Sequence, residues 1–539
     1  MANAEKLTLH RASGDDFEAY YRLKCDPEAI KWSGFASAPD YMRLKAHFKA
    51  LVCSDKLVFF LKDNDRIVGY CQISTDGSVA EVDGYSVLSD YAGKGYGTRL
   101  LAMVIDELRA SPCDRIIARV SEKNLASIKC FSRNGFTVDE TVVPQPVELK
   151  ALGRTDNFIT VSREIGPRYK VAVITAARSE YGLLRWLITD MERDADIDCV
   201  LIAAGAHLSP EQGMTVNQII DDGHKIAHKV DFLLSNENEV GVAKSNGRAA
   251  IAFADVLGEE RPDIVVVLGD RYELLGICST ALLLGIPIAH ISGGDVTEGA
   301  IDNQVRNAVT MMADIHFPGT QESADNIARM RGGTDFIYNV GEPGLDSFIR
   351  EKRMSRAELA ESLNIDPDKK WILCTLHPET RRPIPFSLEM ADNLMAALKT
   401  VPDAQVIVSA ANVDAGGEAM NDIYKDASAG NDNFIFVHSL GHRRYLSFMN
   451  EAWAVVGNSS SGIVEAPFLG IPVINIGSRQ QGRHICTNVV NSGTSYDEIC
   501  KALAAIPPQR LEPDCYFGDG HTSVRIKEHI KDYLRCFRK

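Results

Sequence analysis

The chain has 539 residues, which exceeds what one hydrophobic core usually holds, so we expect two or three domains. Its formal net charge of -15 argues against a general nucleic-acid-binding protein, while 45% hydrophobic and 24% charged residues are typical of a globular protein. No apolar run reaches membrane-spanning length, and the N-terminal residues MANAEKLTLH lack a signal-peptide core. We therefore expect a cytoplasmic protein that does not bind a membrane.

The 12 cysteines are scattered along the chain. None of them forms a CxxC pair, and several lie inside apolar runs, for example Cys199 and Cys374. This distribution indicates reduced, buried thiols in a cytoplasmic protein. It does not indicate zinc ligands, so no metal is expected.

Residues 1–165 mix alternating strand patterns with helical ones. The stretch LVFFLKDNDRIVGYCQIST predicts two strands around an Asn-Asp turn, and EVDGYSVLSD predicts a third. The next residues, YAGKGYGTRLL, place three alternating glycines at the start of a helix predicted over Tyr96–Ala110. Such glycines let backbone N–H groups approach a pyrophosphate, which the helix dipole also favours. The alternative interpretation is a flexible strand–helix turn.

A second segment, from Asn124 to Phe136, predicts a helix that ends at Gly135 and continues as a strand. Together with the glycine loop, it resembles the GNAT acetyltransferase family over about residues 7–165. The resemblance implies an acetyl-CoA site that comprises Gly93, Lys94, Gly95, Tyr96, Gly97 and Asn124.

The chain departs from the GNAT pattern at two positions. Ala92 stands where the family usually has Gln or Arg, which matters little because the contacts there are mainly backbone. Phe131 stands where many members have a Tyr that protonates the leaving thiolate, so the general acid is unassigned. Glu81 and Asp83, before the loop, are candidate bases for the incoming amine; the alternative is that they are merely exposed strand residues.

The chain is predicted to break near Ile165–Arg168, after which strand and helix patterns alternate steadily. This alternation favours doubly wound parallel sheets. The strand candidates are 169–177, 198–204, 263–269, 286–292, 335–340, 371–376, 404–410, 433–438, 452–457 and 471–476. They suggest two sheets divided near Gly341–Arg353, and thus an α/β protein with domains 1–165, 169–345 and 346–539. A cleft between the last two domains is the expected ligand site.

Polar residues follow several of the predicted strands directly. Ile264–Leu268 is followed by Asp270 and Arg271, and Ile286–Ile291 is followed by Ser292 and then Asp295, Glu298 and Asp302. Because ligands bind beyond the carboxyl ends of strands in open α/β sheets, we expect these carboxyl groups to gather at one crevice. Proton-transfer chemistry on an anionic substrate needs such groups with an Arg nearby.

Other predicted strand ends carry groups suited to a nucleoside diphosphate. Arg178 follows the first strand after the break, and His377 follows the strand predicted over 371–376. Ser459, Ser460, Ser461 and Gly462 open a helix, whose hydroxyl and N–H groups suit a diphosphate, and Glu465 one turn later suits ribose hydroxyls. Each feature alone is explained by a capping or turn role, but capping does not explain why all fall at strand ends.

This combination resembles the hydrolysing UDP-N-acetylglucosamine 2-epimerases of the sialic and legionaminic acid pathways, over about residues 169–510. The motifs are TAARSEYG, AAGAHLS, VLGDRYE, HISGGDVTEGAID, TLHPET, HSLG, GNSSSGIVEA and RQQGR. The resemblance implies the two-lobed fold of many nucleotide-sugar glycosyltransferases (GT-B-like), with UDP between the lobes. It also implies elimination of UDP across C1–C2, followed by addition of water with inversion at C2.

The resemblance further implies roles for individual residues. Asp270 and Asp302 match acid/base positions, and His377 matches a histidine near the diphosphate or sugar. The UDP-binding positions are Arg178, Arg271, Ser459, Ser460, Ser461, Gly462, Glu465 and Arg479. Ser292 stands where some members carry a catalytic Glu; Asp295 and Glu298 are the candidates for the missing carboxylate, and we favour Asp295. Arg306-Asn307 also replaces a common Arg-His pair.

An acetyltransferase joined to a hydrolysing 2-epimerase suggests successive action on one nucleotide sugar. A UDP-4-amino-4,6-dideoxy-N-acetylhexosamine would be N-acetylated and then converted to free 2,4-diacetamido-2,4,6-trideoxymannose for legionaminic acid synthesis. The alternatives are conversion of UDP-N-acetylglucosamine to N-acetylmannosamine for sialic acid, with acetylation of another amine, a two-lobed glycosyltransferase, or a GNAT domain that only senses acetyl-CoA. We expect a homodimer or homotetramer from family habit.

Overall fold

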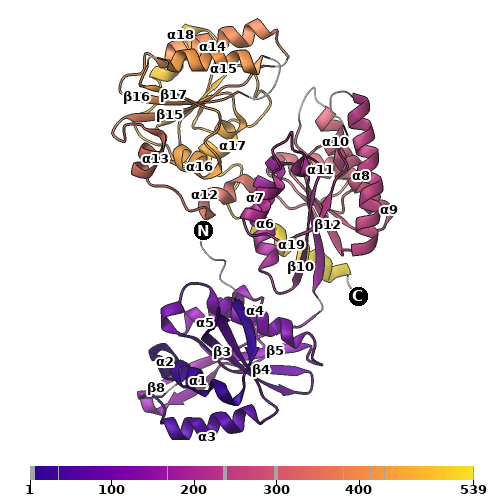
Figure 1. The fold of residues 1–539 in the computed structure, drawn as a ribbon, viewed down its shortest axis with the longest axis vertical. Helices are drawn as coiled ribbons and strands as arrows, with labels where there is room; N and C mark the ends of the chain where they lie inside the picture. The colour runs from indigo at the N-terminus through magenta and orange to yellow at the C-terminus, as the bar shows by residue number, and fades with distance from the viewer. Residues whose placement is uncertain are drawn as a thin grey trace. The chain divides into compact units, whose positions relative to one another are not determined.

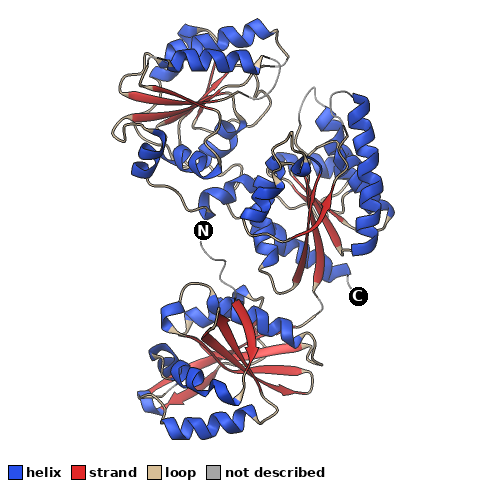
Figure 2. Cartoon of the chain, viewed as in Figure 1, coloured by secondary structure: helices blue, strands red, loops and turns tan. Residues whose placement is uncertain are grey.

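The computed structural model describes residues 7–33, 35–166, 168–234, 239–296, 301–379, 381–411, 416–429 and 431–537. These residues form three β-sheets with their helices (Figures 1 and 2). The chain separates into two compact units. The first unit comprises Met1–Val171 and Met191–Cys199, and the second comprises Ala172–Asp190 and Val200–Lys539.

The first unit contains a mainly antiparallel sheet of order β1-β2-β3-β4-β5-β8-β6, with β7 paired to β8. Its strands are β1 (Leu7–Arg11), β2 (Leu57–Asp63), β3 (Arg66–Asp76), β4 (Val79–Val87), β5 (Arg115–Ser121), β6 (Thr137–Val138), β7 (Gln145–Leu149) and β8 (Arg154–Glu164). Its helices are α1 (Phe17–Lys24), α2 (Pro27–Ser33), α3 (Tyr41–Val52), α4 (Tyr96–Leu108) and α5 (Leu125–Arg133). β4 and β5 run parallel to each other.

Strand β4 changes its pairing halfway along. Against β3, Ile73 pairs with Val82 and Gln72 pairs with Gly84, so Asp83 is an extra residue in a β-bulge. Against β5, β4 is paired from Val79 to Val82 and no further within the described chain. The second half of β4 therefore has one edge that β5 does not cover.

The second sheet is parallel and has the order β11-β10-β9-β12-β13-β14. Its strands are β9 (Tyr169–Thr175), β10 (Ile197–Ala204), β11 (Ile226–Val230), β12 (Ile264–Leu268), β13 (Ile288–Ile291) and β14 (Ile315–Phe317). The accompanying helices are α6 (Arg178–Glu192), α7 (Val216–Asp221), α8 (Glu239–Glu260), α9 (Glu273–Leu283), α10 (Ile301–Met312) and α11 (Gln321–Arg331).

The third sheet is also parallel, with the order β17-β16-β15-β18-β19-β20. Its strands are β15 (Lys370–Thr375), β16 (Ala404–Ser409), β17 (Phe434–Val437), β18 (Ala454–Gly457), β19 (Val473–Ile476) and β20 (Val489–Ser492). The remaining helices are α12 (Asp346–Arg350), α13 (Arg356–Leu363), α14 (Ile384–Leu398), α15 (Gly417–Ser428), α16 (His442–Glu451), α17 (Ser460–Phe468), α18 (Tyr496–Ala504) and α19 (Thr522–Phe537).

Both parallel sheets reverse their strand order once, between β9 and β12 and between β15 and β18. Such a reversal is a topological switch point, where ligands of open α/β sheets bind beyond the strand ends. Separate apolar clusters cover the two faces of the third sheet, which explains why its strands are apolar on both faces. The predicted fold class, an α/β domain followed by two doubly wound parallel sheets, is confirmed.

The strand predicted over 335–340 is wrong. This segment makes a single bridge, between Ile337 and His316, instead of a ladder. Its aromatic residues pack on α19, with Phe336 against Tyr533 and Tyr338 stacked on His529. Three strands of the two parallel sheets escaped prediction, namely β11, β14 and β20; β14 and β20 span only three and four residues, too few to show a period.

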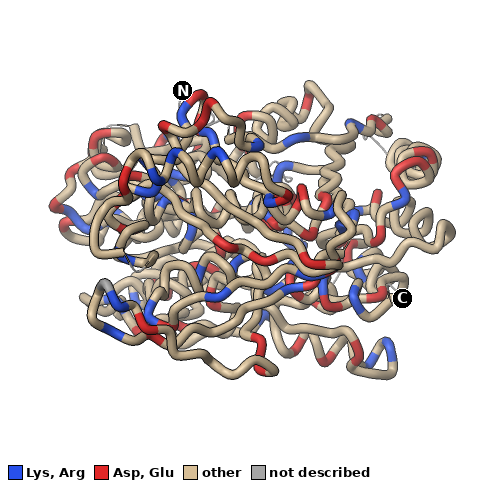
Figure 3. The backbone as a smooth tube through the Cα atoms, turned by 90° about the horizontal axis from the view of Figure 1, so that it is seen from below, with Lys and Arg blue, Asp and Glu red and all other residues tan. Residues whose placement is uncertain are grey.

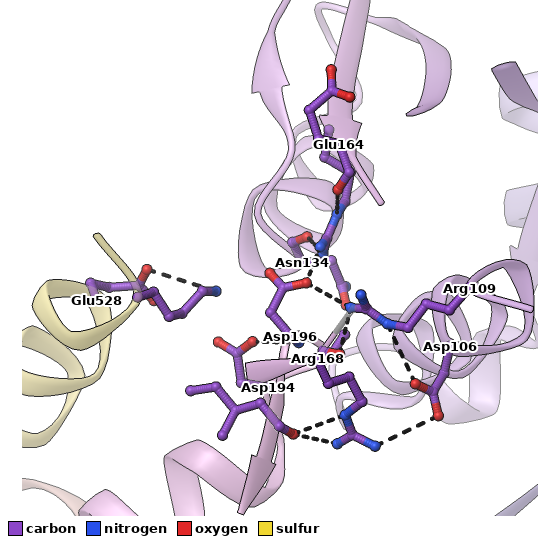
Figure 4. A network of polar contacts seen from close by, with 12 residues as sticks. Asp106, Arg109, Asn134, Glu164, Arg168, Asp194, Asp196 and Glu528 are labelled. Atoms are coloured by element: carbon purple, nitrogen blue, oxygen red, sulfur yellow. Dashed lines mark hydrogen bonds and ion pairs between the residues drawn. The ribbon is translucent and has the colours of Figure 1, made fainter. Parts of the chain in front are cut away.

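A polar network within the first unit surrounds Asp196 (Figure 4). The Asp196 carboxylate accepts hydrogen bonds from Arg109, at 2.6 Å, and from Arg163. Arg168 donates to the carbonyl oxygen of Ile197 at 3.0 Å and lies 3.8 Å from Asp106. These contacts explain why Met191–Cys199 belongs to the first unit.

Positively and negatively charged residues are interspersed along the backbone (Figure 3). All 12 cysteines are free thiols; Cys374 is buried as expected, and Cys199 is half-buried. Among the described residues, no helix combines the length and apolar character needed to cross a membrane.

Candidate functional site

The switch point of the second sheet is flanked by the loops after β9 and β12. Glu180, in the first turn of α6, accepts hydrogen bonds from the backbone N–H groups of Ala176 (2.7 Å) and Ala177 (3.1 Å). Burial raises the pKa of Glu180 to about 7. Arg271, after β12, donates to Glu273 at 2.6 Å and lies 3.8 Å from Glu180. Arg271 therefore ties the two strand ends together, while Arg178 is exposed at the start of α6.

The partner of Asp270 is Arg306 on α10, not the adjacent Arg271. Arg306 is 7% exposed, and its Nη1 also donates to the backbone oxygen of Asp295 at 2.9 Å. It thus joins the loop after β12 to the loop after β13. Sequence reasoning noted Arg306 only as a departure from a family pair and missed this role. The available signal was its position one helical turn after Asp302, which places it on the same side of α10 as a predicted site residue.

The loop after β13 carries the carboxylate that sequence reasoning favoured. The Asp295 carboxylate accepts a hydrogen bond from Ser323 Oγ at 2.5 Å. Burial raises the pKa of Asp295, although Ser323 and Arg483 oppose the shift. Ser292 has a left-handed backbone (φ 59°), and its N–H donates to the Phe317 oxygen. Asp302 is exposed on the first turn of α10, and Glu298 lies outside the described residues.

A further carboxylate, Glu342, was missed because its segment was interpreted only as a domain division. Its backbone N–H donates to the Phe517 oxygen at 2.7 Å, and its side chain lies against Gly319, where a Cβ atom would collide with it. Burial raises the pKa of Glu342, and the neighbouring Asp295 raises it further, although Arg483 and Arg306 oppose the shift. Glu342 keeps some exposed surface and so remains accessible to a ligand.

The switch point of the third sheet is organised around Asn458. Its side chain accepts from the His377 N–H at 2.7 Å and donates to the His377 oxygen at 2.9 Å. Its backbone oxygen accepts from Arg479 (3.1 Å) and Gln480 (2.8 Å). The ends of β15, β18 and β19 are therefore held together, and two predicted site residues, His377 and Arg479, meet there.

The helix α17 begins with the predicted serine cluster. Ser459 and Ser461 hydroxyls lie 2.9 Å apart, and Tyr445 donates to Ser461 at 2.6 Å, whereas Ser460 is exposed. Gly462 is buried against β19, where a Cβ would approach Val473 to 3.2 Å, so its role is close packing.

Glu465, one turn into α17, is the residue of this helix best suited to bind a ligand. Its Oε2 atom is buried and has no hydrogen-bond partner among the described residues. Burial raises the pKa of Glu465 to about 7. A buried carboxylate oxygen without a partner costs free energy, on the order of 1–3 kcal/mol, which a ligand hydroxyl would recover.

In the first unit, the glycine loop leads into the N-terminus of α4. Gly93 and Gly95 are left-handed (φ 75° and 86°), and Gly95 is the N-cap of α4. Lys94 donates to the Asp90 oxygen at 2.9 Å, and Tyr96 donates to Asp63 at 3.0 Å. Asn124 caps α5 by accepting from the Ser127 N–H at 3.1 Å. The side chains of Lys94, Tyr96 and Asn124 therefore have structural partners, which leaves the loop backbone as the candidate binding feature.

Both candidate bases on β4 are engaged in ion pairs. Glu81 accepts from Arg119 at 2.8 Å, and Asp83 contacts Lys56 at 2.5 Å and Ser74 at 2.9 Å. Although desolvation raises the pKa of Asp83, the hydrogen bonds from Lys56, Ser74 and Gln72 hold it below its usual value. Asp83 is thus a weak proton acceptor in this arrangement.

Two family models match the chain: UDP-N-acetylglucosamine 2-epimerase over residues 189–531, and the acetyltransferase (GNAT) family over residues 19–136. A GDP/UDP-N,N'-diacetylbacillosamine 2-epimerase (hydrolyzing) of Campylobacter jejuni is 35% identical, over 60% of this chain and 84% of its own. A UDP-N,N'-diacetylbacillosamine 2-epimerase (hydrolyzing) of Legionella pneumophila is 33% identical, over 67% of this chain and 95% of its own.

A solved structure of Neisseria meningitidis UDP-GlcNAc 2-epimerase bound to UDP-GlcNAc has a similar fold. The TM-score is 0.56 at 16% identity, over 67% of this chain and all of that one. This similarity supports the GT-B-like arrangement expected from the sequence.

Proposed function

Because the chain belongs to the UDP-N-acetylglucosamine 2-epimerase family and carries a GNAT acetyltransferase domain, we propose that both parts act on one UDP sugar. The chain is an enzyme that combines a hydrolysing UDP-sugar 2-epimerase with an acetyltransferase domain. The first step acetylates the 4-amino group of a UDP-4-amino-4,6-dideoxy-N-acetylhexosamine with acetyl-CoA. The second step releases UDP and yields 2,4-diacetamido-2,4,6-trideoxymannose, a legionaminic acid precursor.

One observation carries this proposal. Two relatives at 33% and 35% identity are named as epimerases of a diacetamido sugar, and this chain adds a domain that can make the second acetamido group. If the acetyltransferase domain makes the substrate of the epimerase, the fusion is explained without a second, unrelated amine.

In the epimerase reaction, we assign the proton transfers to the carboxylates around Arg306. Asp270 is oriented by its ion pair with Arg306 and removes the C2 proton as UDP leaves C1. Asp295, which burial favours in the protonated state, supplies the acid for hydration of the glycal. Asp302, on the exposed first turn of α10, approaches once substrate is bound.

We assign the UDP group to the switch point of the third sheet. The N-terminus of α17, with Ser459 and Ser460, receives the diphosphate together with His377 and Arg479. Glu465 binds the two ribose hydroxyls through the oxygen that lacks a partner. Because UDP sugars and acetyl-CoA are cytoplasmic metabolites, and the 12 cysteines are free, we place the enzyme in the cytoplasm.

The second candidate function is conversion of UDP-N-acetylglucosamine to N-acetylmannosamine for sialic acid. The solved neighbour that binds UDP-GlcNAc favours it. In that case the GNAT domain acetylates another amine or only senses acetyl-CoA.

Incubation of the full chain with each UDP sugar, with and without acetyl-CoA, distinguishes these functions. We expect the 4-amino sugar to release UDP only when acetyl-CoA is present, and the product to be the free diacetamido mannose by NMR. Turnover of UDP-N-acetylglucosamine alone, with no acetylation of the 4-amino sugar, would exclude the diacetamido proposal.

A further inference from the structure

Tyr85 carries a buried hydroxyl group whose purpose the fold does not explain. Its Oη has less than 1 Å² of accessible surface and no hydrogen-bond partner among the described residues. Its one polar contact in the described chain is a weak hydrogen-bonding interaction with the side chain of Cys130, whose thiol is a poor substitute for an oxygen or nitrogen partner. Leaving a hydroxyl buried without a strong hydrogen bond is destabilising. A ligand atom is therefore a reasonable missing partner.

The bulge in β4 determines the direction of this side chain. Before Asp83, Ala80 and Val82 pack in the apolar cluster that contains α4; after it, Tyr85 and Val87 do so. Strict alternation from Val82 would have turned Gly84 to this side instead of Tyr85. The extra residue thus points the phenol ring toward α4, as bulges beside active sites commonly do.

The hydroxyl lies against the third glycine of the phosphate loop. A Cβ atom at Gly97 would collide with Tyr85 Oη and would lie 3.4 Å from Cys130 Sγ. The Tyr85 ring also packs against Phe131, with ring centroids 5.8 Å apart. Tyr85 therefore lies between the start of α4 and the position on α5 where the sequence left the general acid unassigned.

The unpaired edge of β4 offers a route for a substrate arm in the part of the strand that contains Tyr85. Beyond Val82, the β5-facing edge of β4 has no paired partner in the described chain, so its backbone groups can bind an extended ligand. A molecule whose phosphates sit on the loop at Gly93–Gly97 can extend an amide-containing arm along this edge toward the bulge. The pantetheine arm of acetyl-CoA, with its two amides and terminal thioester, has this chemistry.

We propose that Tyr85 donates the proton to the sulfur of CoA during acetyl transfer. The amine nitrogen attacks the thioester carbonyl and forms the C–N bond. The C–S bond then breaks, its electron pair stays on sulfur, and the Tyr85 Oη proton moves to sulfur to give the CoA thiol. The nitrogen loses its extra proton to water, and the buried tyrosinate regains a proton once CoA has left and water can enter the vacated site.

The surroundings of Tyr85 suit this role. Burial raises the pKa of Tyr85, so the phenol stays protonated until the thiolate forms. The same burial disfavours a free thiolate, so the proton moves between two groups whose charged forms are both destabilised. This inference rests on the proposed acetyltransferase function.

The direct test is Tyr85→Phe, which keeps the ring and removes only a hydroxyl that has no partner. We expect kcat for acetyl transfer to fall about 100-fold or more, with the KM for acetyl-CoA and the melting temperature little changed. UDP release by the epimerase should be unaffected. A variant that retains kcat, or that loses activity only through KM or unfolding, would overturn the proposal.

Tyr20→Phe is a matched control. Tyr20 is fully buried in another aromatic cluster, stacked on Phe48 at 4.7 Å, and its hydroxyl also lacks a hydrogen-bond partner among the described residues. Loss of the Tyr20 hydroxyl should leave acetyl transfer unchanged. An equal loss of kcat in both variants would mean that the effect is structural, which counts against Tyr85 as the acid.

A second readout does not depend on the acceptor amine. The ultraviolet absorbance of the thiolate reports the pKa of the CoA thiol when CoA is bound. A hydroxyl that donates to sulfur stabilises the thiolate, so this pKa should be lower in the wild-type complex than in Tyr85→Phe; equal values would refute the assignment. If the wild-type chain acetylates no amine, the proposed function fails. The titration still tests separately whether the Tyr85 hydroxyl donates to the sulfur of bound CoA.

Discussion

The ribose-binding role of Glu465 makes a quantitative prediction about pH. Burial raises the pKa of this carboxyl from 4.5 to about 7, and its buried Oε2 has no partner among the described residues. Only the ionised carboxylate accepts both ribose hydroxyls, so binding requires loss of the proton. Since about one molecule in ten is ionised one pH unit below the pKa, affinity for a UDP sugar should be about tenfold weaker at about pH 6 than at about pH 8.

The variant Glu465→Gln removes the ionisation. Hydrogen bonds to a charged acceptor contribute about 1.5–3 kcal/mol, so the variant should bind about 10- to 100-fold more weakly at about pH 8. Its affinity should no longer change with pH, and the difference from wild type should shrink at about pH 6. Glu389→Gln, at an exposed position on α14, is the control and should keep the wild-type profile.

Isothermal titration calorimetry at several pH values measures the affinity for a UDP sugar. A UDP sugar is a suitable ligand because its diphosphate does not titrate near neutral pH. The otherwise wild-type protein, the Glu465→Gln variant and the Glu389→Gln control should all carry Asp270→Asn, so that turnover does not distort the measured heats. The absence of UDP release should be checked in each. If the wild-type affinity is flat between about pH 6 and 8, or if the Gln variant keeps the slope, Glu465 does not bind the ribose in the way proposed.

Three further perturbations separate the two activities and the proton-transfer roles. Asp270→Asn should abolish UDP release but leave CoA release intact; loss of both would contradict independent sites. In Gly97→Ala the new methyl would collide with Tyr85, so acetyl transfer should fall and stability should drop by about 1–3 kcal/mol in a thermal melt. Gly14→Ala is the control, because a Cβ there meets nothing within 4 Å, and it should change neither acetyl transfer nor stability. Because Glu342 has a raised pKa and is protonated at neutral pH, the epimerase rate should fall as rising pH removes that proton, and Glu342→Gln should lose this alkaline fall in a pH–rate profile.

The elements that position the site could largely be predicted from the sequence. Buried apolar runs such as Ile264–Leu268 end abruptly in polar residues, and this pattern locates strand ends in a parallel sheet. The glycine loop before α4 could be recognised in the same way, because its φ angles of 75° and 86° are those that glycine tolerates.

What the sequence could not show was which groups meet in space. Arg306 and Asp270 are 36 residues apart, and their ion pair depends on how α10 is rotated against the sheet. Glu342 comes close to Asp295 only through the path of the chain after β14. Tyr85 faces α4 because of one bulged residue, and the alternation in EVDGYSV does not reveal where a bulge falls.

The central claim is that the chain releases UDP by elimination and then hydrates the glycal with inversion at C2. The most direct measurement is NMR of the product formed in heavy water from the UDP-diacetamido sugar. The account predicts free UDP and a free sugar of the manno configuration with deuterium at C2. A product that retains the C2 proton or the gluco configuration would contradict it.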